Sequence, residues 1–215
     1  MLTSYHMTKF LHTIAQALSI LLYPMLMPLY GMCLFAVAIR HVAPVLPAAY
    51  TAVAIVGTAV ITLIIPITLL LILWRKGQVD SLHINNHKQR TMPYLYTLTC
   101  YGFWAYFLHA TLQLPPFMLL IALGAIAALL AVTIINRWWK ISAHLTGLGG
   151  LLGGVCSFAL YYSRLPILLI CSMLAIALLL MYARLYLRAH TPTQVVVGFL
   201  LGLLACFLPS LIAYA

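Results

Sequence analysis

Long apolar segments dominate this 215-residue chain and decide what it can fold into. Hydrophobic residues make up 66% of the sequence and charged residues only 6%, so the chain is far more apolar than a soluble domain of this size. A helix needs about 20 apolar residues to cross a bilayer. We therefore predict an all-α, polytopic transmembrane bundle of six or seven spans in a single domain, residues 1–215. The segments are at about residues 10–39, 51–74, 93–113, 117–136, 142–162, 167–187 and 192–213.

Prolines interrupt the first two of these segments. Pro24 and Pro28 lie inside the first segment, and Pro66 lies inside the second. A proline in a helix interior removes one amide donor and clashes with the preceding turn, so we expect the first helix to be kinked or broken at Pro24 and Pro28. The first segment is too long for a cleavable signal peptide and has no small-residue cleavage site, so we expect it to belong to the membrane domain.

The charge balance limits the chemistry that this chain can perform. It has eleven lysines and arginines but one acidic residue, Asp80. The cations are scattered at segment ends, which favours anionic lipid headgroups over nucleic acid as partners. Magnesium and calcium sites need carboxylate oxygens, and one aspartate cannot build a two-metal site. We therefore expect no metal and no other cofactor, and any phosphate chemistry must use arginine, lysine and histidine.

Three polar clusters fall on the same side of the membrane. They are the loop at residues 75–93, the segment at 137–144 and the segment at 184–192, and two spans separate each cluster from the next. Ionisable groups at the membrane boundary are costly and usually functional. The alternation of spans thus predicts that the three clusters meet at one membrane face.

The third cluster has the most informative spacing. Arg184 lies six residues before His190, and Gln194 lies four residues after it. Thr191 and Pro192 form a good helix start, with a hydroxyl to cap free amides and a proline at the first helical position. His190 would then lie beside a helix N-terminus, which favours an anion such as phosphate. The alternative is that these polar groups only mark the membrane–water boundary.

The order of the clusters resembles the signature motifs of the type 2 phosphatidic acid phosphatase (PAP2) superfamily, which shares its pocket with vanadium haloperoxidases. The family motif S-R-x5-H-x3-D corresponds to Arg184, His190 and Gln194, with glutamine in place of the aspartate. The motif P-S-G-H corresponds to residues 141–144, in which only Ser142 and His144 keep the family residue. The resemblance covers about residues 75–205.

The first family motif, K-x6-R-P, is the least well matched. Arg90 aligns with its arginine, but the next proline is Pro93. His83 stands where the lysine would be, and Lys88 is a nearby substitute. His83 and His87 also have the spacing of a helical metal pair, but the sequence offers no third ligand.

The resemblance implies a metal-independent phosphatase acting on a lipid phosphomonoester or pyrophosphate. His190 would be the nucleophile that forms a phosphohistidine, and His144 would protonate the leaving oxygen and later activate water. Gln194 can accept the other ring N–H of His190 and fix its tautomer, although it cannot offset positive charge on the ring. The substrate phosphate would be held by arginines and other donors, with these candidates: Arg90, Arg184, Ser142, Lys88 and Lys140.

Several alternatives stay open at this point. A non-catalytic protein that binds or transports a lipid phosphate would keep the same fold. The glycines that follow His144 fit either close helix contacts or phosphate donors. We expect a multi-pass protein of the bacterial cytoplasmic membrane, with lipids as its partners, but the membrane side that the site faces stays open because phosphate-binding cations compromise the positive-inside rule.

Overall fold

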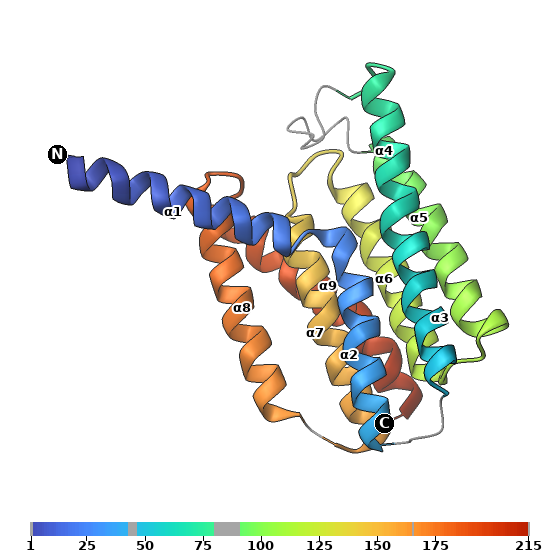
Figure 1. The fold of residues 1–215 in the computed structure, drawn as a ribbon. Coiled ribbons are helices and arrows are strands. Elements are labelled where there is room, and N and C mark those ends of the chain that lie inside the picture. The colour runs from blue at the N-terminus through green and yellow to red at the C-terminus, as the bar shows by residue number, and fades with distance from the viewer. Residues whose placement is uncertain (1, 43–46, 80–90, 165, 215) are drawn as a thin grey trace.

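The computed structural model describes residues 2–42, 47–79, 91–164 and 166–214, and every regular element within them is helical, as predicted. Figure 1 shows a bundle in which most helices run side by side. The elements are α1 (Leu2–Leu21), η1 (Pro24–Leu26), α2 (Met27–Val42), α3 (Ala48–Ala59), η2 (Val60–Ile64), α4 (Ile65–Arg75), α5 (Thr91–Tyr106), η4 (Phe107–Thr111), α6 (Pro116–Ile135), α7 (Ala143–Tyr162), α8 (Ile167–Tyr186) and α9 (Pro192–Tyr214).

By length and composition, five described helices can cross a membrane: the continuous helix Ala48–Arg75, α6, α7, α8 and α9. The bent pair of α1 and α2 makes a sixth if it counts as one span. The chain is therefore a multi-pass membrane protein. The predicted segment 93–113 forms α5 and η4, which run beside α6 in Figure 1 but are not among the helices that this test of length and composition selects. Its tyrosines, threonines and histidine make it less apolar than its neighbours, although it still packs against α6.

The prolines of the first two segments have different effects, and only those of the first segment break the helix, as predicted. The first segment breaks where α1 ends at Leu21 and Pro24 starts the short 3₁₀ helix η1, which gives a bend of 41°. Pro66 instead lies in the first turn of α4, immediately after the π-helical turn η2. The helix is nevertheless continuous from Ala48 to Arg75, with the wider π-helical turn placed directly before the proline.

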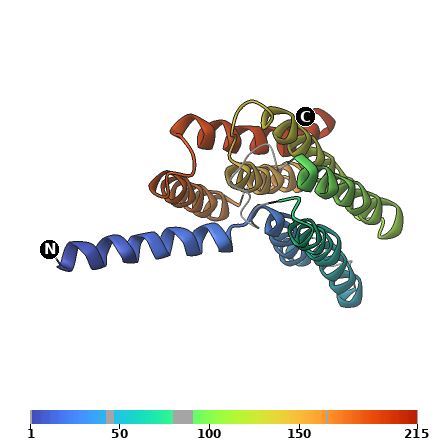
Figure 2. The same cartoon turned by 90° about the horizontal axis from the view of Figure 1, so that it is seen from above.

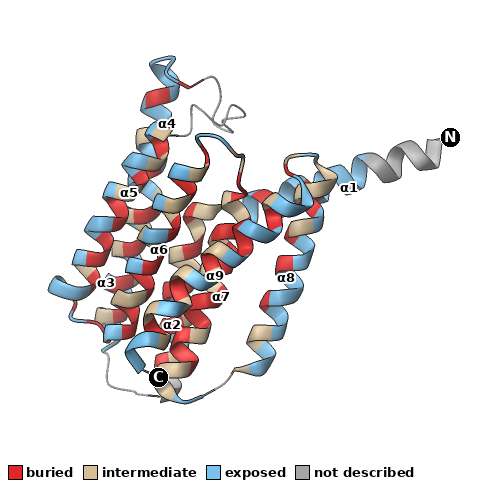
Figure 3. Ribbon diagram, turned by 180° about the vertical axis from the view of Figure 1, so that it is seen from behind, coloured by how far each residue is buried: buried red, intermediate tan, exposed pale blue. Residues whose placement is uncertain are grey.

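Helix α7 is the centre of the bundle. Its apolar window is 61% buried, whereas the other four spans have 22–39% of theirs buried (Figure 3). Its closest neighbour is α9, and each helix contributes a pair of glycines to the contact. The pair on α7 is Gly149 and Gly153, and the pair on α9 is Gly198 and Gly202. Each pair has the four-residue spacing that lets helix backbones approach in membranes. Gly149 and Gly153 are therefore close helix contacts, which decides between the two interpretations for this pair.

The arrangement of loops confirms the predicted topology. Figure 1 shows the end of α4, the α6–α7 loop and the α8–α9 loop at one end of the bundle, which we call the site end. The C-terminus lies at the opposite end. Helix α1 packs against α8 and extends away from the bundle, as Figure 2 shows from above.

Candidate functional site

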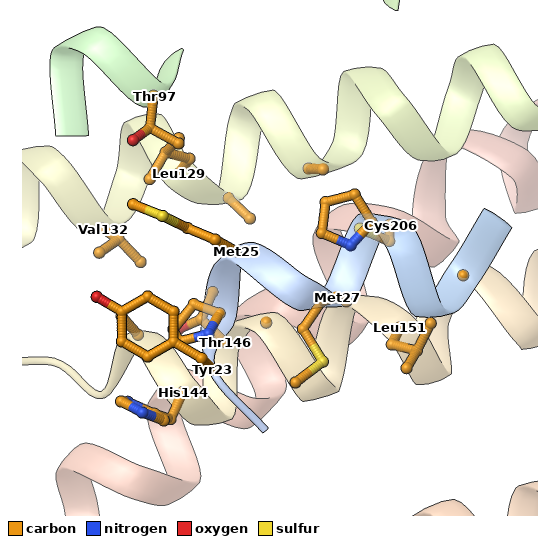
Figure 4. A pocket seen from close by; sticks show the side chains of 18 of the residues that line it. Tyr23, Met25, Met27, Thr97, Leu129, Val132, His144, Thr146, Leu151 and Cys206 are labelled. Carbon is orange, nitrogen blue, oxygen red and sulfur yellow. The ribbon is translucent and has the colours of Figure 1, made fainter. Parts of the chain in front are cut away.

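A long cavity of about 860 Å³ opens among helices α1, α2, α5, α6 and α7. Its wall on α6 extends from Met118 to Val132, which corresponds to about 20 Å of helix. Most of the wall is apolar, and Figure 4 shows α2 running along it with Met25 and Met27 among the lining side chains. The site end is polar, because these predicted side chains line the cavity there: Lys140, His144, Arg184 and His190.

His190 is held in one orientation by two carbonyl oxygens. The residue is only 9% exposed, and its ring Nδ1 lies 3.1 Å from Gln194 Oε1 and 3.2 Å from the backbone oxygen of Lys140. The amide of Thr191 also donates to Gln194 Oε1, at 3.1 Å, so this side-chain atom must be the oxygen. Both partners of Nδ1 can only accept, so Nδ1 carries the proton. The lone pair of the neutral ring therefore lies on Nε2.

The start of α9 follows the predicted pattern with one correction. The helix begins at Pro192, directly after Thr191, as expected. The hydroxyl of Thr191 does not cap an amide, however, because it pairs with the hydroxyl of Thr193 at 3.1 Å. Gln194 takes over part of the cap by accepting from the Thr191 amide, which is one half of a capping box. The same glutamine oxygen thus caps the helix and orients His190.

His144 and Arg184 both contact one residue of α1 that the sequence analysis missed. His144 Nε2 lies 3.1 Å from the backbone oxygen of Ser19, and Arg184 Nη1 donates to Ser19 Oγ at 3.1 Å. The edge of the Tyr23 ring also packs on the His144 ring, with centroids 5.6 Å apart and planes at 89° (Figure 4). Because the Ser19 carbonyl only accepts, His144 is protonated at Nε2 in either charge state.

Comparison with known proteins gives the family. A model of the PAP2 superfamily matches residues 94–214, which is more than half of the chain. The chain belongs to the PAP2 superfamily. Members of this superfamily generally hydrolyse phosphate esters, so a phosphatase-type function follows for the family as a whole. Searches of the curated proteins and of the solved structures found no match.

The PAP2 match covers two of the three predicted motifs. His144, Arg184, His190 and Gln194 lie within it. It begins at residue 94 and ends at 214, whereas the predicted resemblance ran from about 75 to 205. Arg90 and Lys88 therefore precede the match, and both lie outside the described residues, as do Asp80, His83 and His87.

Ser142 lies beside the cavity instead of in its wall. This PAP2 motif residue is fully buried and is not among the residues that line the cavity. Its amide donates to the Gln194 backbone oxygen at 3.3 Å, so it ties the start of α7 to the start of α9. Its hydroxyl has no hydrogen-bond partner within the described part of the chain. A role for Ser142 in binding phosphate stays a prediction.

Nothing in the primary structure singles out Ser19. It lies on a helix that precedes the PAP2 match, 125 residues before His144 and 165 before Arg184. A single serine in an apolar helix has no motif around it, so only its place in the fold reveals the contact. In the described ranges, no group of three or more histidine, cysteine or acidic side chains could hold a metal ion.

Proposed function

We propose that this PAP2 protein is a metal-independent phosphatase that hydrolyses a lipid phosphomonoester or a lipid pyrophosphate through a phosphohistidine. The observation that carries the proposal is the tautomer of His190. Hydrogen bonds to Gln194 and Lys140 hold the proton on Nδ1, which leaves Nε2 as a nucleophile. The same cavity contains Arg184 to bind phosphate oxygens and His144 to transfer protons.

The reaction would proceed in two steps. His190 Nε2 attacks the terminal phosphorus, and the bond from phosphorus to the leaving oxygen breaks. This is the alcohol oxygen of a monoester or the bridging oxygen of a pyrophosphate, and it takes a proton from the His144 imidazolium. A water molecule then attacks the phosphohistidine while neutral His144 takes its proton, and the Nε2–P bond breaks to release inorganic phosphate. Arg184 and Lys140 offset the negative charge on the phosphoryl oxygens in both steps.

The shape of the cavity supports a lipid as the substrate. Its polar groups gather at the site end, and apolar side chains line the rest of the wall along α6. This distribution suits a molecule with an anionic head and a hydrocarbon tail. The tail would occupy the apolar length while the phosphate meets His190.

The first test is hydrolysis by the purified protein in detergent, with a short-chain phosphatidic acid as substrate and EDTA present. We expect release of inorganic phosphate, inhibition by vanadate, and a trapped phosphoprotein that is labile in acid and stable in alkali. Tight binding of phosphatidic acid without any turnover would favour the alternative, a lipid-phosphate binding or transport protein. A requirement for added magnesium would contradict the mechanism.

Gln194 offers a separate test of the orientation of His190. We expect Gln194→Leu to lower kcat by about 10- to 100-fold with little change in KM, because the leucine cannot hold Nδ1 and the tautomer is no longer fixed. Gln194→Asp should keep activity and move the acid limb of the pH–rate profile to higher pH, because a carboxylate favours the protonated ring. A Gln194→Leu variant with wild-type kcat would show that the side chain only caps α9.

A further inference from the structure

Arg188 adopts a backbone conformation that suits glycine. Its φ angle is +50°, in the left-handed region, at the C-terminal end of α8. The amide of Arg188 donates to Leu185 O at 2.9 Å, and the amide of Ala189 donates to Arg184 O at 3.0 Å. These two bonds form a Schellman motif, in which the left-handed residue is usually glycine.

Two other helices end in the same motif and allow a comparison. Helix α4 ends with Gly77 at φ +69°, and α7 ends with Ser163 at φ +52°. A left-handed conformation brings a Cβ atom too close to the following carbonyl oxygen, whereas glycine adopts it freely. Arginine at this position therefore carries strain that glycine would remove, and strain of this kind is a reason to look for a function in the side chain.

The surroundings of Arg188 indicate what that function is. The residue is exposed, lines the cavity and lies two residues before His190, so it borders the cavity opening at the site end. Lys140 and Arg184 line the same end. The whole sequence contains one acidic residue, and the described residues include no hydrogen-bond or ion-pair partner for the Arg188 guanidinium. The opening thus holds a third cation that the hydrolysis mechanism does not use.

We propose that Arg188 binds a second anionic group of the substrate and makes the site selective for a lipid diphosphate over a lipid monophosphate. The inference rests on the proposed function and narrows its substrate class. Arg184 and Lys140 already match the charge of one phosphate, which is about −1.5 to −2 at neutral pH. A diphosphate has a second phosphate group that carries negative charge of its own. An arginine at the opening can bind the oxygens of that group bidentately.

Arg188→Gly is a clean test because glycine suits the left-handed backbone, so the Schellman motif should persist. We would measure kcat/KM on farnesyl diphosphate and farnesyl monophosphate in the same detergent. The wild type should prefer the diphosphate. The variant should lose about tenfold on the diphosphate and less than about twofold on the monophosphate. Ser163→Gly is the matched control: it makes the same backbone change at the far end of α7 and should leave both values unchanged.

A binding measurement separates this inference from the proposed function. Inorganic pyrophosphate should raise the Tm of the wild type more than inorganic phosphate does, and Arg188→Gly should abolish that difference. If neither farnesyl ester is hydrolysed, the phosphatase proposal fails. The comparison of Tm with pyrophosphate and with phosphate then still decides whether Arg188 binds a second anionic group. An unchanged substrate ratio together with an unchanged pyrophosphate effect would overturn the inference. A loss of activity that is equal on both substrates and occurs only in phosphatidylglycerol vesicles would also overturn it, in favour of membrane anchoring.

Discussion

Replacing His190 with asparagine is expected to lower kcat for lipid phosphate hydrolysis by at least about a thousandfold. The asparagine amide nitrogen can take the place of Nδ1 and donate to Gln194 Oε1 and Lys140 O, which His190 Nδ1 now contacts at 3.1 and 3.2 Å. The fold around the start of α9 should therefore persist. The variant has no group in the place of Nε2, so no phosphohistidine can form. Phosphate release and phosphoprotein trapping should both disappear.

The matched control is His109→Asn. His109 is exposed in η4 and is not among the residues that line the cavity, so this variant should hydrolyse lipid phosphate at the wild-type rate. Thermal unfolding of both variants would show whether any loss reflects misfolding. Substantial turnover by a folded His190→Asn variant would exclude His190 as the nucleophile. Loss of activity in both variants to the same degree would mean that the effect is unrelated to the site.

The arrangement around His190 was predictable because it depends on local spacing. Gln194 is the third residue of a helix that begins at Pro192, a position from which a side chain can fold back over the helix start, so its contact with His190 was predictable from the spacing. The meeting of His144, Arg184 and His190 at one cavity follows from counting spans between polar segments. The Lys140 carbonyl that shares Nδ1 was not predictable, because a backbone oxygen leaves no trace in a residue pattern.

The contributions of Ser19 and Arg188 needed coordinates for different reasons. Ser19 reaches the site because α1 breaks before Pro24 and packs on α8, and neither the angle of that bend nor the partner of α1 can be obtained from hydropathy. In the sequence, nothing distinguishes Arg188 from the other cations at the ends of apolar segments. Its left-handed backbone, at φ +50°, depends on where α8 ends, and that position is hard to predict to within one residue.

The helical fold itself followed from composition, but the spans and their packing did so only in part. Apolar length and composition select five spans, and they do not select α5, where aromatic and polar residues are interspersed. A buried hydrogen bond from Trp104 Nε1 to Thr58 Oγ1, at 2.9 Å, ties α5 to α3. Helix α5 is thus held partly by polar contacts with its neighbours, which a hydropathy scale counts against a membrane span.

Substituting alanine for Gly202 is expected to cause the largest loss of stability of any single methyl addition in the bundle. A Cβ atom at Gly202 would collide with the backbone oxygen of Thr146 and would lie 2.7 Å from the amide nitrogen of Gly150. Both contacts are with backbone, which cannot turn aside, so the helices must separate. Overpacking of this kind costs about 3 kcal/mol or more, which corresponds to a fall in Tm of about 10 °C for a chain of this size.

Gly102→Ala is the matched control, because a Cβ atom at Gly102 in α5 would have no heavy atom within 4 Å. Alanine favours a helix over glycine by about 1 kcal/mol, so this variant should unfold at the wild-type Tm or slightly above it. Equal Tm values for the two variants in the same detergent would show that α7 and α9 are not held in close contact.

The contact between α7 and α9 also matters for chemistry, because it sets the distance between the two histidines' helices. One turn from Gly202 towards the site end, a Cβ atom at Gly198 would lie 2.7 Å from Ser142 O, and the Ser142 amide donates to Gln194 O. The close approach thus continues to the residues that precede His144 and follow His190. Separation of the helices at Gly202 should move Gln194 relative to α7, so the Gly202→Ala variant should lose activity even well below its lowered Tm. Full activity at such a temperature would show that the site tolerates the displacement of α9.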